Sequence, residues 1–212
     1  MEAFTNLDGA RIVYAMIKAI QENKQYLSDI DGAIGDGDHG INMNKGFTFC
    51  EAELVKSPGD MSYSMKVLSR VLMADIGGSM GPLYGMFFSE MSRVSKGKEI
   101  VDAKLLGEML LAGEQAIREI GGAEVGDKTL LDCLVPAVIA FSNGIDAGKT
   151  FADALECMKT AAVEGRDSTK DMVARVGRSS RLGERSRGVL DAGAVSCCMV
   201  LLSMADTING ML

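Results

Sequence analysis

Residues 6–28 read NLDGARIVYAMIKAIQENKQYLS, and their apolar positions recur with the period of an α-helix. The side chains that would share one face of this helix are Leu7, Ile12, Val13, Met16, Ile17, Ile20 and Leu27. A half-buried strand would instead alternate apolar and polar residues, and we find no convincing run of that kind in the chain. The stretch therefore favours an all-α protein that begins with one long amphipathic helix.

The helical period continues to the C-terminus in segments separated by glycine-bearing breaks. We expect the later helices at residues 42–56, 61–76, 82–95, 103–120, from 127 onward with a kink at Pro136, 150–165 and 191–211. The connections are short and no linker is evident, so the sequence predicts a single domain, residues 1–212, of about eight helices.

Composition and charge exclude several classes of protein. The net charge of −7 disfavours sequence-independent nucleic-acid binding, which depends on a surplus of Lys and Arg. The longest apolar stretch, 194–205, is about 12 residues long and too short to span a bilayer. The five cysteines form no Cys-x-x-Cys pair, and the first residues lack the pattern of a signal peptide. We therefore expect a cytoplasmic protein with neither nucleic acid nor membrane as a partner.

Glycine is in excess for a helical protein, with 25 glycines against only 3 prolines. Sixteen of the 25 fall in four patches between predicted helices, at residues 29–46, 77–85, 121–126 and 177–193. The same patches collect Asp, Asn, Ser and Arg residues and the single histidine, His39. This clustering predicts one site assembled from four connections at the ends of helices.

The first patch contains DGAIGDGDHGINM at residues 31–43, with three carboxylates within eight residues. If Asp31, Asp36 and Asp38 converge, each pair repels by roughly 4 kcal/mol at about 4 Å and an effective dielectric near 20. Cations would relieve this repulsion, and carboxylate oxygens are ligands that Mg²⁺ prefers. The spacing does not fit an EF-hand calcium loop. The alternative is a solvated acidic turn in which Asp38 or Asn42 caps the next helix.

The other patches are less specific. Residues 75–85 fit a phosphate cradle at a helix N-terminus, or an ordinary glycine-rich turn. In residues 126–129, Asp127 is either the N-cap of a helix or part of a group in which Lys128 and Thr129 reach a phosphate or nucleoside. Four arginines within residues 178–187 suit phosphate, or pair with the protein's own carboxylates. We expect His39 to contact phosphate, with an ordinary structural role as the alternative.

Together these motifs resemble the nucleotide-binding L subunit of dihydroxyacetone kinases. The family's Ile-Gly-Asp-(Gly/Ala)-Asp-His-Gly-x-Asn-Met matches residues 34–43, its Gly-Asp-Lys-Thr matches 126–129, and its Gly-Arg-x-Ser-x-Leu-Gly-Glu-Arg-Ser matches 177–186. The resemblance covers essentially the whole chain. It implies an antiparallel eight-helix barrel or bundle with nucleotide bound at one end.

The resemblance also implies roles for individual residues. Two Mg²⁺ ions would lie on Asp31, Asp36 and Asp38 and bridge the phosphates of ADP or ATP, and these carboxylates would act in catalysis together with Arg178. The residues implied to surround the nucleotide are His39, Gly40, Ile41, Asn42, Ser79, Met80, Gly121, Leu130, Arg178, Asp191, Ala192 and Gly193. The chain departs from the family at Gly77–Gly81, usually Gly-Gly-x-Ser-Gly, and at 189–193, usually His-Pro-Asp-Pro-Gly.

One version of this family fuses its K and L modules and uses free ATP. In the other, a separate L subunit keeps ADP as a cofactor, which a phosphoprotein (the M subunit) of the phosphoenolpyruvate-dependent phosphotransferase system rephosphorylates. The family's K module holds the sugar on a histidine, and this chain's only histidine lies in the metal motif. The resemblance thus favours half an enzyme of the second type, relaying phosphate to dihydroxyacetone or a related ketose on a K subunit. An ATP-dependent kinase subunit, or a nucleotide-sensing module that reports to a transcriptional regulator, are the alternatives.

Overall fold

The computed structural model describes residues 2–212, so Met1, the first residue of the expected domain, lies outside it. Nine α-helices occur in the described part: α1 (Ala10–Glu22), α2 (Lys24–Ile34), α3 (His39–Lys56), α4 (Met61–Asp75), α5 (Met80–Ser95), α6 (Ala103–Gly121), α7 (Leu131–Asp146), α8 (Phe151–Ser168) and α9 (Ala192–Asn209). Two 3₁₀ segments, η1 (Thr169–Asp171) and η2 (Ser179–Ser186), join α8 to α9. The expected all-α class is confirmed, with one helix more than predicted.

The additional helix arises because the predicted helix 6–28 is broken at Asn23. Asn23 has φ −106° and ψ 12°, and its Nδ2 donates to the carbonyl oxygen of Ala19 at 2.8 Å, closing the end of α1. A second helix, α2, starts at once and continues to Ile34. The predicted start was also too early, since Leu7 precedes α1 and is 72% exposed rather than part of the buried face.

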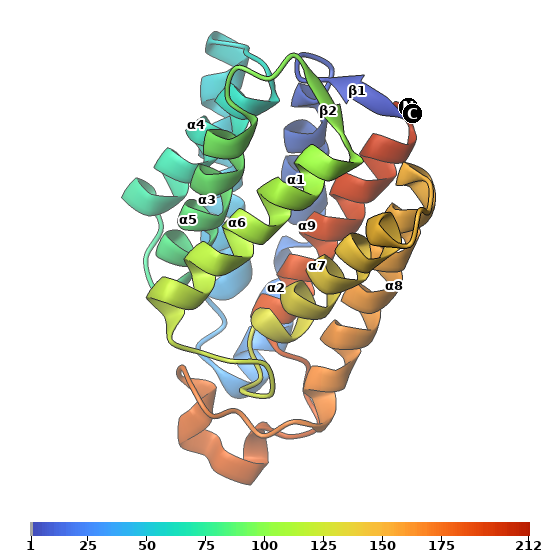
Figure 1. Ribbon diagram of the computed structural model, residues 1–212. Coiled ribbons are helices and arrows are strands. Elements are labelled where there is room, and N and C mark those ends of the chain that lie inside the picture. Colours follow the sequence, from blue (N-terminus) through green and yellow to red (C-terminus); the bar gives the residue numbers. More distant parts are fainter. Residues whose placement is uncertain (1) are drawn as a thin grey trace.

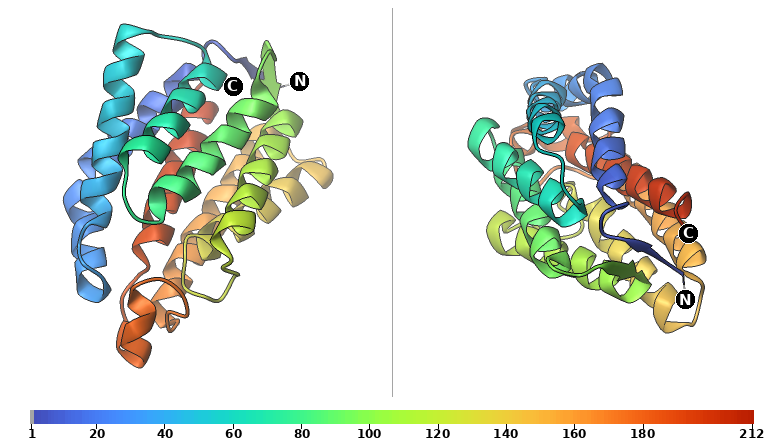
Figure 2. Two further views of the ribbon diagram at one scale, coloured as in Figure 1. Left: turned by 90° about the vertical axis from the view of Figure 1, so that its left-hand side faces the viewer. Right: turned by 90° about the horizontal axis from the view of Figure 1, so that it is seen from above.

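The helices form a closed ring around a shared apolar core. From α3 to α9 each helix packs on the next, and α1 contacts both α9 and α3, which completes the ring. Consecutive helices from α2 onward run in opposite directions, so every second connection falls at the same end of the bundle (Figures 1 and 2). The core contains Phe47, Phe88 and Phe141, each fully buried.

The opposite end of the bundle carries the chain termini and a small β-ribbon (Figure 1). β1 (Ala3–Thr5) pairs antiparallel with β2 (Ile100–Asp102), with Phe4 opposite Val101. Strands of three residues are too short to show an alternating pattern, which explains why the sequence did not predict them.

By length and composition alone, helix α9 could cross a membrane, although its longest apolar stretch, 194–205, is only about 12 residues long. However, 61% of it is buried inside the bundle, where Val195, Leu201 and Met204 contribute to the core. A helix that is apolar all round is expected when neighbours cover most of its surface.

Several glycines of the first patch lie in helices rather than in a loop. Gly32 is in α2, and Gly40 and Gly46 are in α3, which starts at His39 instead of Asn42. A Cβ at Gly40 would overlap the carbonyl oxygen of Lys24, and one at Gly46 would come within 2.6 Å of the Leu72 side chain. Part of the glycine excess therefore permits close contact between helices.

Candidate functional site

Four connections meet at the end of the bundle away from the termini: α2–α3, α4–α5, α6–α7 and α8–α9. They enclose one pocket of about 490 Å³, a size typical of small-molecule sites. All four glycine-bearing patches contribute residues to its wall. The structure thus brings together the four patches that the sequence predicts to form one site.

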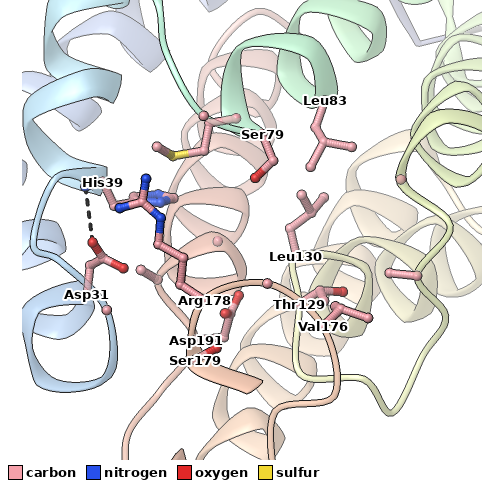
Figure 3. Close-up of a pocket in the computed structure, with 18 of the residues that line it drawn as sticks. Asp31, His39, Ser79, Leu83, Thr129, Leu130, Val176, Arg178, Ser179 and Asp191 are labelled. Carbon is pink, nitrogen blue, oxygen red and sulfur yellow. Dashed lines mark hydrogen bonds between the residues drawn. The ribbon is translucent and has the colours of Figure 1, made fainter. Parts of the chain in front are cut away.

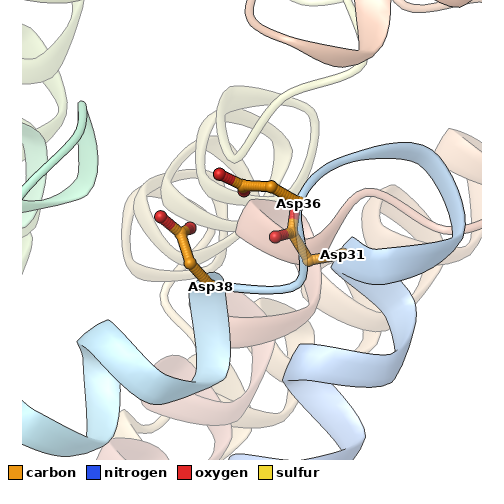
Figure 4. A group of neighbouring side chains, drawn as sticks. All are labelled: Asp31, Asp36 and Asp38. Carbon is orange, nitrogen blue, oxygen red and sulfur yellow. The ribbon is translucent and has the colours of Figure 1, made fainter.

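The three carboxylates of the first patch converge at this pocket (Figure 4). Asp31 lies in the last turns of α2, Asp36 in the connection, and Asp38 at the N-cap of α3, and one oxygen of each lies within 4.8 Å of the others. Gly37 between them has φ +75°, a conformation that glycine adopts without strain. The tight α2–α3 turn is therefore what draws the carboxylates together.

The guanidinium of Arg178 and the N-terminus of α3 both stabilise the negative charge of these carboxylates. Arg178, exposed at the start of η2, forms an ion pair with Asp36 and lies 3.9 Å from Asp38. The backbone N–H of His39, in the first turn of α3, donates to Asp31 Oδ2 at 3.3 Å, where the helix dipole favours negative charge. The side chain that accepts from the start of α3 is therefore Asp31, and the alternative in which Asp38 or Asn42 caps the helix is not what the structure has.

The far side of the pocket is apolar. Leu83, Ile117, Ile120, Leu130 and Val176 contribute to it, and Figure 3 shows Leu83 and Leu130 across the cavity from Asp31 and His39. Leu83, Ile117 and Ile120 were not among the predicted site residues, because in the sequence they belong to the apolar faces of helices. One end of the cavity thus suits charged oxygen atoms and the other a flat apolar group.

The predicted site residues divide into two groups by position. Most line the pocket: Asp31, Asp36, Asp38, His39, Ser79, Met80, Gly121, Leu130, Arg178, Asp191, Ala192 and Gly193. Gly40, Ile41 and Asn42 do not; Gly40 packs on α2 and Ile41 is 53% exposed. Their predicted contacts with a nucleotide stay predictions.

His39 is buried at the wall of the pocket and held by a chain of hydrogen bonds. Its Nε2 lies 2.9 Å from Ser196 Oγ, which lies 2.7 Å from the hydroxyl of the buried Tyr84. Burial lowers the pKa of His39 to about 4, so the imidazole is neutral near pH 7. A neutral, fixed ring can contact a ligand without adding charge.

Ser196→Ala should destabilise the protein, because it removes the partner that His39 Nε2 and the Tyr84 hydroxyl share and leaves Tyr84 only its 3.3 Å bond to the carbonyl oxygen of Gly193. We expect a loss of about 2 kcal/mol in the free energy of unfolding, measured by urea denaturation. Ser203→Ala is the control: Ser203 is on the same helix α9, its hydroxyl has no hydrogen bond to any residue of 2–212, and the change in this energy should be less than about 0.5 kcal/mol. Equal stability of the two variants would contradict the role of Ser196.

The α6–α7 connection differs from the sequence prediction. Asp127 is not a helix N-cap, since α7 begins only at Leu131, and its side chain accepts instead from the N–H of Glu124. The turn is stabilised by Asp132, which accepts from the N–H groups of Gly126 and Thr129. Lys128 and Thr129 both line the pocket, but the ammonium group of Lys128 is bound to backbone carbonyls.

Asp191 caps the N-terminus of α9 beside the pocket. Its Oδ2 accepts from the N–H of Ala194 at 2.7 Å. Burial of the carboxyl group raises its pKa to about 7, with further upward contributions from the charges of Asp132 and Asp31. Another negative group at this wall is therefore costly unless cations are bound nearby.

A family model described as the DAK2 domain matches residues 33–206. The chain belongs to this family. The match includes Asp36, Asp38 and Arg178 and all the connections that form the pocket, so the DAK2 domain contains nearly the whole candidate site.

Four curated relatives of this DAK2 chain are matched over most of their own length, 85–91%. It is 39% identical to the protein named "PEP-dependent dihydroxyacetone kinase 1, ADP-binding subunit DhaL" of Listeria innocua, over 89% of each chain. It is 35% identical to the PEP-dependent ADP-binding subunit DhaL of Escherichia coli K12, over 85% of this chain and 87% of the relative. The dihydroxyacetone kinase of C. freundii in complex with AMP-PNP and Mg²⁺ has the same fold, with a TM-score of 0.70, 22% identity and coverage of 93% of this chain and 33% of that one.

Proposed function

We propose that the protein is the ADP- or ATP-carrying subunit of a dihydroxyacetone kinase and relays a phosphoryl group through its bound nucleotide. The donor would be a phosphoprotein of the phosphotransferase system, and the acceptor dihydroxyacetone, or a related ketose, on a separate K subunit. The observation that carries the proposal is the meeting of three carboxylates and an arginine at the polar end of a pocket whose other end is apolar. Residues 1–212 would act as one domain in the cytoplasm.

The donor set of the acidic cluster fits magnesium. Asp31, Asp36 and Asp38 offer oxygen atoms within 4.8 Å of one another, and hard cations such as Mg²⁺ prefer carboxylate oxygens together with phosphates. We expect these three residues to hold two Mg²⁺ ions. When bound, the metal neutralises charge on the phosphates and lowers the cost of bringing carboxylates close to them.

The rest of the pocket fits a nucleotide. His39, Ser79 and Met80 line the polar end, where we place the phosphates, with Gly40, Ile41 and Asn42 at the adjoining first turn of α3. Gly121 and Leu130, which line the pocket beside its apolar wall, would flank the ribose and base, and the N-terminus of α9, Asp191 to Gly193, would close the site. Arg178 would move from its carboxylate partners to the transferred phosphoryl group, for which a guanidinium offers paired donors.

Two observations favour the phosphotransferase-dependent type. The relatives of similar length, including one from Lactococcus lactis at 36% identity, are named as PEP- or PTS-dependent ADP-binding subunits. By contrast, the L-erythrulose kinase of Pectobacterium atrosepticum matches the chain over only 35% of its own length. The chain's single histidine is buried against Ser196, so it is not available to hold a sugar covalently. A sugar-binding K subunit and a phosphoprotein M subunit are therefore the proposed partners.

Gentle purification should yield the protein with bound ADP. We expect about one nucleotide per chain when Mg²⁺ is present throughout, measured by denaturing the protein and chromatographing the extract. Treatment with EDTA should release the nucleotide. A protein that neither retains nor rebinds ADP in Mg²⁺ would contradict the proposal.

A phosphotransfer assay distinguishes the proposed activity from its alternatives. With K subunit and dihydroxyacetone, we expect turnover from phosphoenolpyruvate and its carrier proteins, with ADP needed only in catalytic amount. Turnover with ATP alone would identify an ATP-dependent kinase subunit. Nucleotide-dependent binding of a transcriptional regulator without any turnover would identify a sensing module.

A further inference from the structure

Lys128 is buried, with 1% of its surface exposed, and its ammonium group is saturated by backbone carbonyls. Nζ donates to the carbonyl oxygens of Met172 at 3.2 Å, Ser186 at 2.5 Å and Val189 at 2.6 Å. An ammonium has three N–H donors, so none remains for a ligand phosphate. Burial lowers the pKa of Lys128, and the charge of Asp191 opposes this shift.

The three carbonyls belong to one segment, residues 172–190, which has almost no core of its own. Within it only Ala174 and Ser186 are buried, and the other side chains are exposed or half-buried. A segment that buries little apolar surface needs other interactions to stay ordered. Arg178, the arginine at the carboxylate cluster, lies in this segment.

The backbone of Lys128 is held in an uncommon conformation. Its φ of +64° is the only positive φ outside glycine in residues 2–212. Asp132 stabilises the turn by accepting from the N–H groups on either side of it, at Gly126 and Thr129. A non-glycine residue in this region is strained, and such strain persists where the surroundings fix it.

We propose that Lys128 is a positioning residue that fixes residues 172–190 through three carbonyls and so places Arg178 at the carboxylate cluster. The fixation follows from the hydrogen bonds alone. Only its consequence for phosphoryl transfer rests on the proposed function. The role differs from the phosphate contact considered from the sequence.

Hydrogen–deuterium exchange of the isolated protein tests the fixation without any nucleotide or partner. The amides of Ala174, Arg175 and Gly188 donate to Ser186 Oγ and to the carbonyl oxygens of Asp127 and Lys170, and in Lys128→Met we expect them to exchange at least tenfold faster than in the wild type. Amides of the buried helix α7 should keep their rates. Lys170→Met removes an exposed lysine next to the segment and should leave all these rates unchanged.

Lys128→Arg is a second variant, to be used if Lys128→Met does not fold. It keeps the positive charge, but its planar guanidinium cannot take the place of the compact ammonium among the three carbonyls. The same three amides should exchange faster than in the wild type there too. Wild-type exchange rates in either folded variant would overturn the proposal.

A double-mutant cycle tests whether Lys128 acts through Arg178. In the phosphotransfer assay we expect Lys128→Met to lower kcat at least tenfold while KM for the ketose-loaded K subunit changes less than threefold. In an Arg178→Met background the same substitution should change kcat by less than twofold. Effects that multiply would overturn the positioning role. If the wild type shows no turnover, the proposed function fails, and the exchange measurement alone decides whether Lys128 fixes the segment.

Discussion

Asp36→Asn is expected to weaken binding of Mg-ADP by about 100-fold or more, equivalent to about 2.7 kcal/mol. The substitution removes one of three charged oxygen donors that lie within 4.8 Å of one another, and a neutral amide is a poorer ligand for Mg²⁺. Isothermal titration calorimetry in Mg²⁺ measures the change. The loss should be much smaller in a titration of ADP without Mg²⁺, because the carboxylate itself repels phosphate.

The matched control for this prediction is Asp29→Asn. Asp29 is exposed on helix α2, which precedes the connection that carries Asp36; it accepts from Gln25 at 2.7 Å and does not line the pocket. Its substitution makes the same change of charge and size and should alter the affinity by less than twofold. Unchanged affinity in Asp36→Asn would show that the carboxylate cluster is not the metal site.

Asp36→Asn is expected to weaken Mg-ADP binding strongly but to change the free energy of unfolding of the ligand-free protein only slightly. Asp36 is 45% exposed and its partner Arg178 is 58% exposed, and pairs of this kind contribute about 0–1 kcal/mol. The free energy of unfolding of Asp36→Asn, measured by urea denaturation, should therefore lie within about 1 kcal/mol of the wild-type value. A larger loss would point to a structural role for Asp36.

Most of the helical pattern could be predicted from the sequence, because apolar periodicity reports burial directly. The predicted 61–76 and 103–120 correspond to α4 and α6, which end at Asp75 and Gly121. The break at Asn23 could not be predicted, since the apolar period continues across it and only the backbone geometry changes. Such a break depends on how α1 and α2 pack on different neighbours.

The sequence also predicted that the four connections form one site, but it did not predict which helix residues line the apolar side of the pocket. In a bundle whose successive helices run in opposite directions, every second connection meets at one end, so four polar glycine-bearing patches come together. Leu83 and Ile117 resemble any core residue in the sequence, because the side of a helix that faces a cavity is as apolar as the side that faces a neighbour.

Lys128 shows a different limit of sequence reasoning. A lysine beside glycine and threonine in a polar loop is typical of a phosphate contact. Whether its ammonium group binds a ligand or backbone carbonyls depends on the position of residues 172–190, which lie more than forty residues later in the chain. The 3.2 Å hydrogen bond from Lys128 Nζ to the carbonyl oxygen of Met172 is an example. Only the tertiary structure supplies that information.

Arg178→Met is expected to lower kcat of phosphoryl transfer by about 10³-fold, the lower end of the effect of arginines that act on a transferred phosphoryl group. Methionine keeps an unbranched stem but removes the guanidinium. Affinity for Mg-ADP should change less than tenfold, because the three carboxylates are intact. Calorimetry and the phosphotransfer assay together separate binding from turnover.

Arg181→Met is the control, since Arg181 is exposed in η2, the 3₁₀ segment that Arg178 precedes, and does not line the pocket. It should retain kcat within about twofold, whereas equal losses in both variants would indicate damage to the segment rather than loss of a catalytic group.

The ion pair between Arg178 and Asp36 is compatible with a role of Arg178 in phosphoryl transfer. Because the pair with Asp36 is exposed and weak, Arg178 stays near the carboxylates at little cost and can exchange them for phosphate oxygens when nucleotide and metal bind. Retained kcat in Arg178→Met would mean that this exchange does not contribute to the reaction.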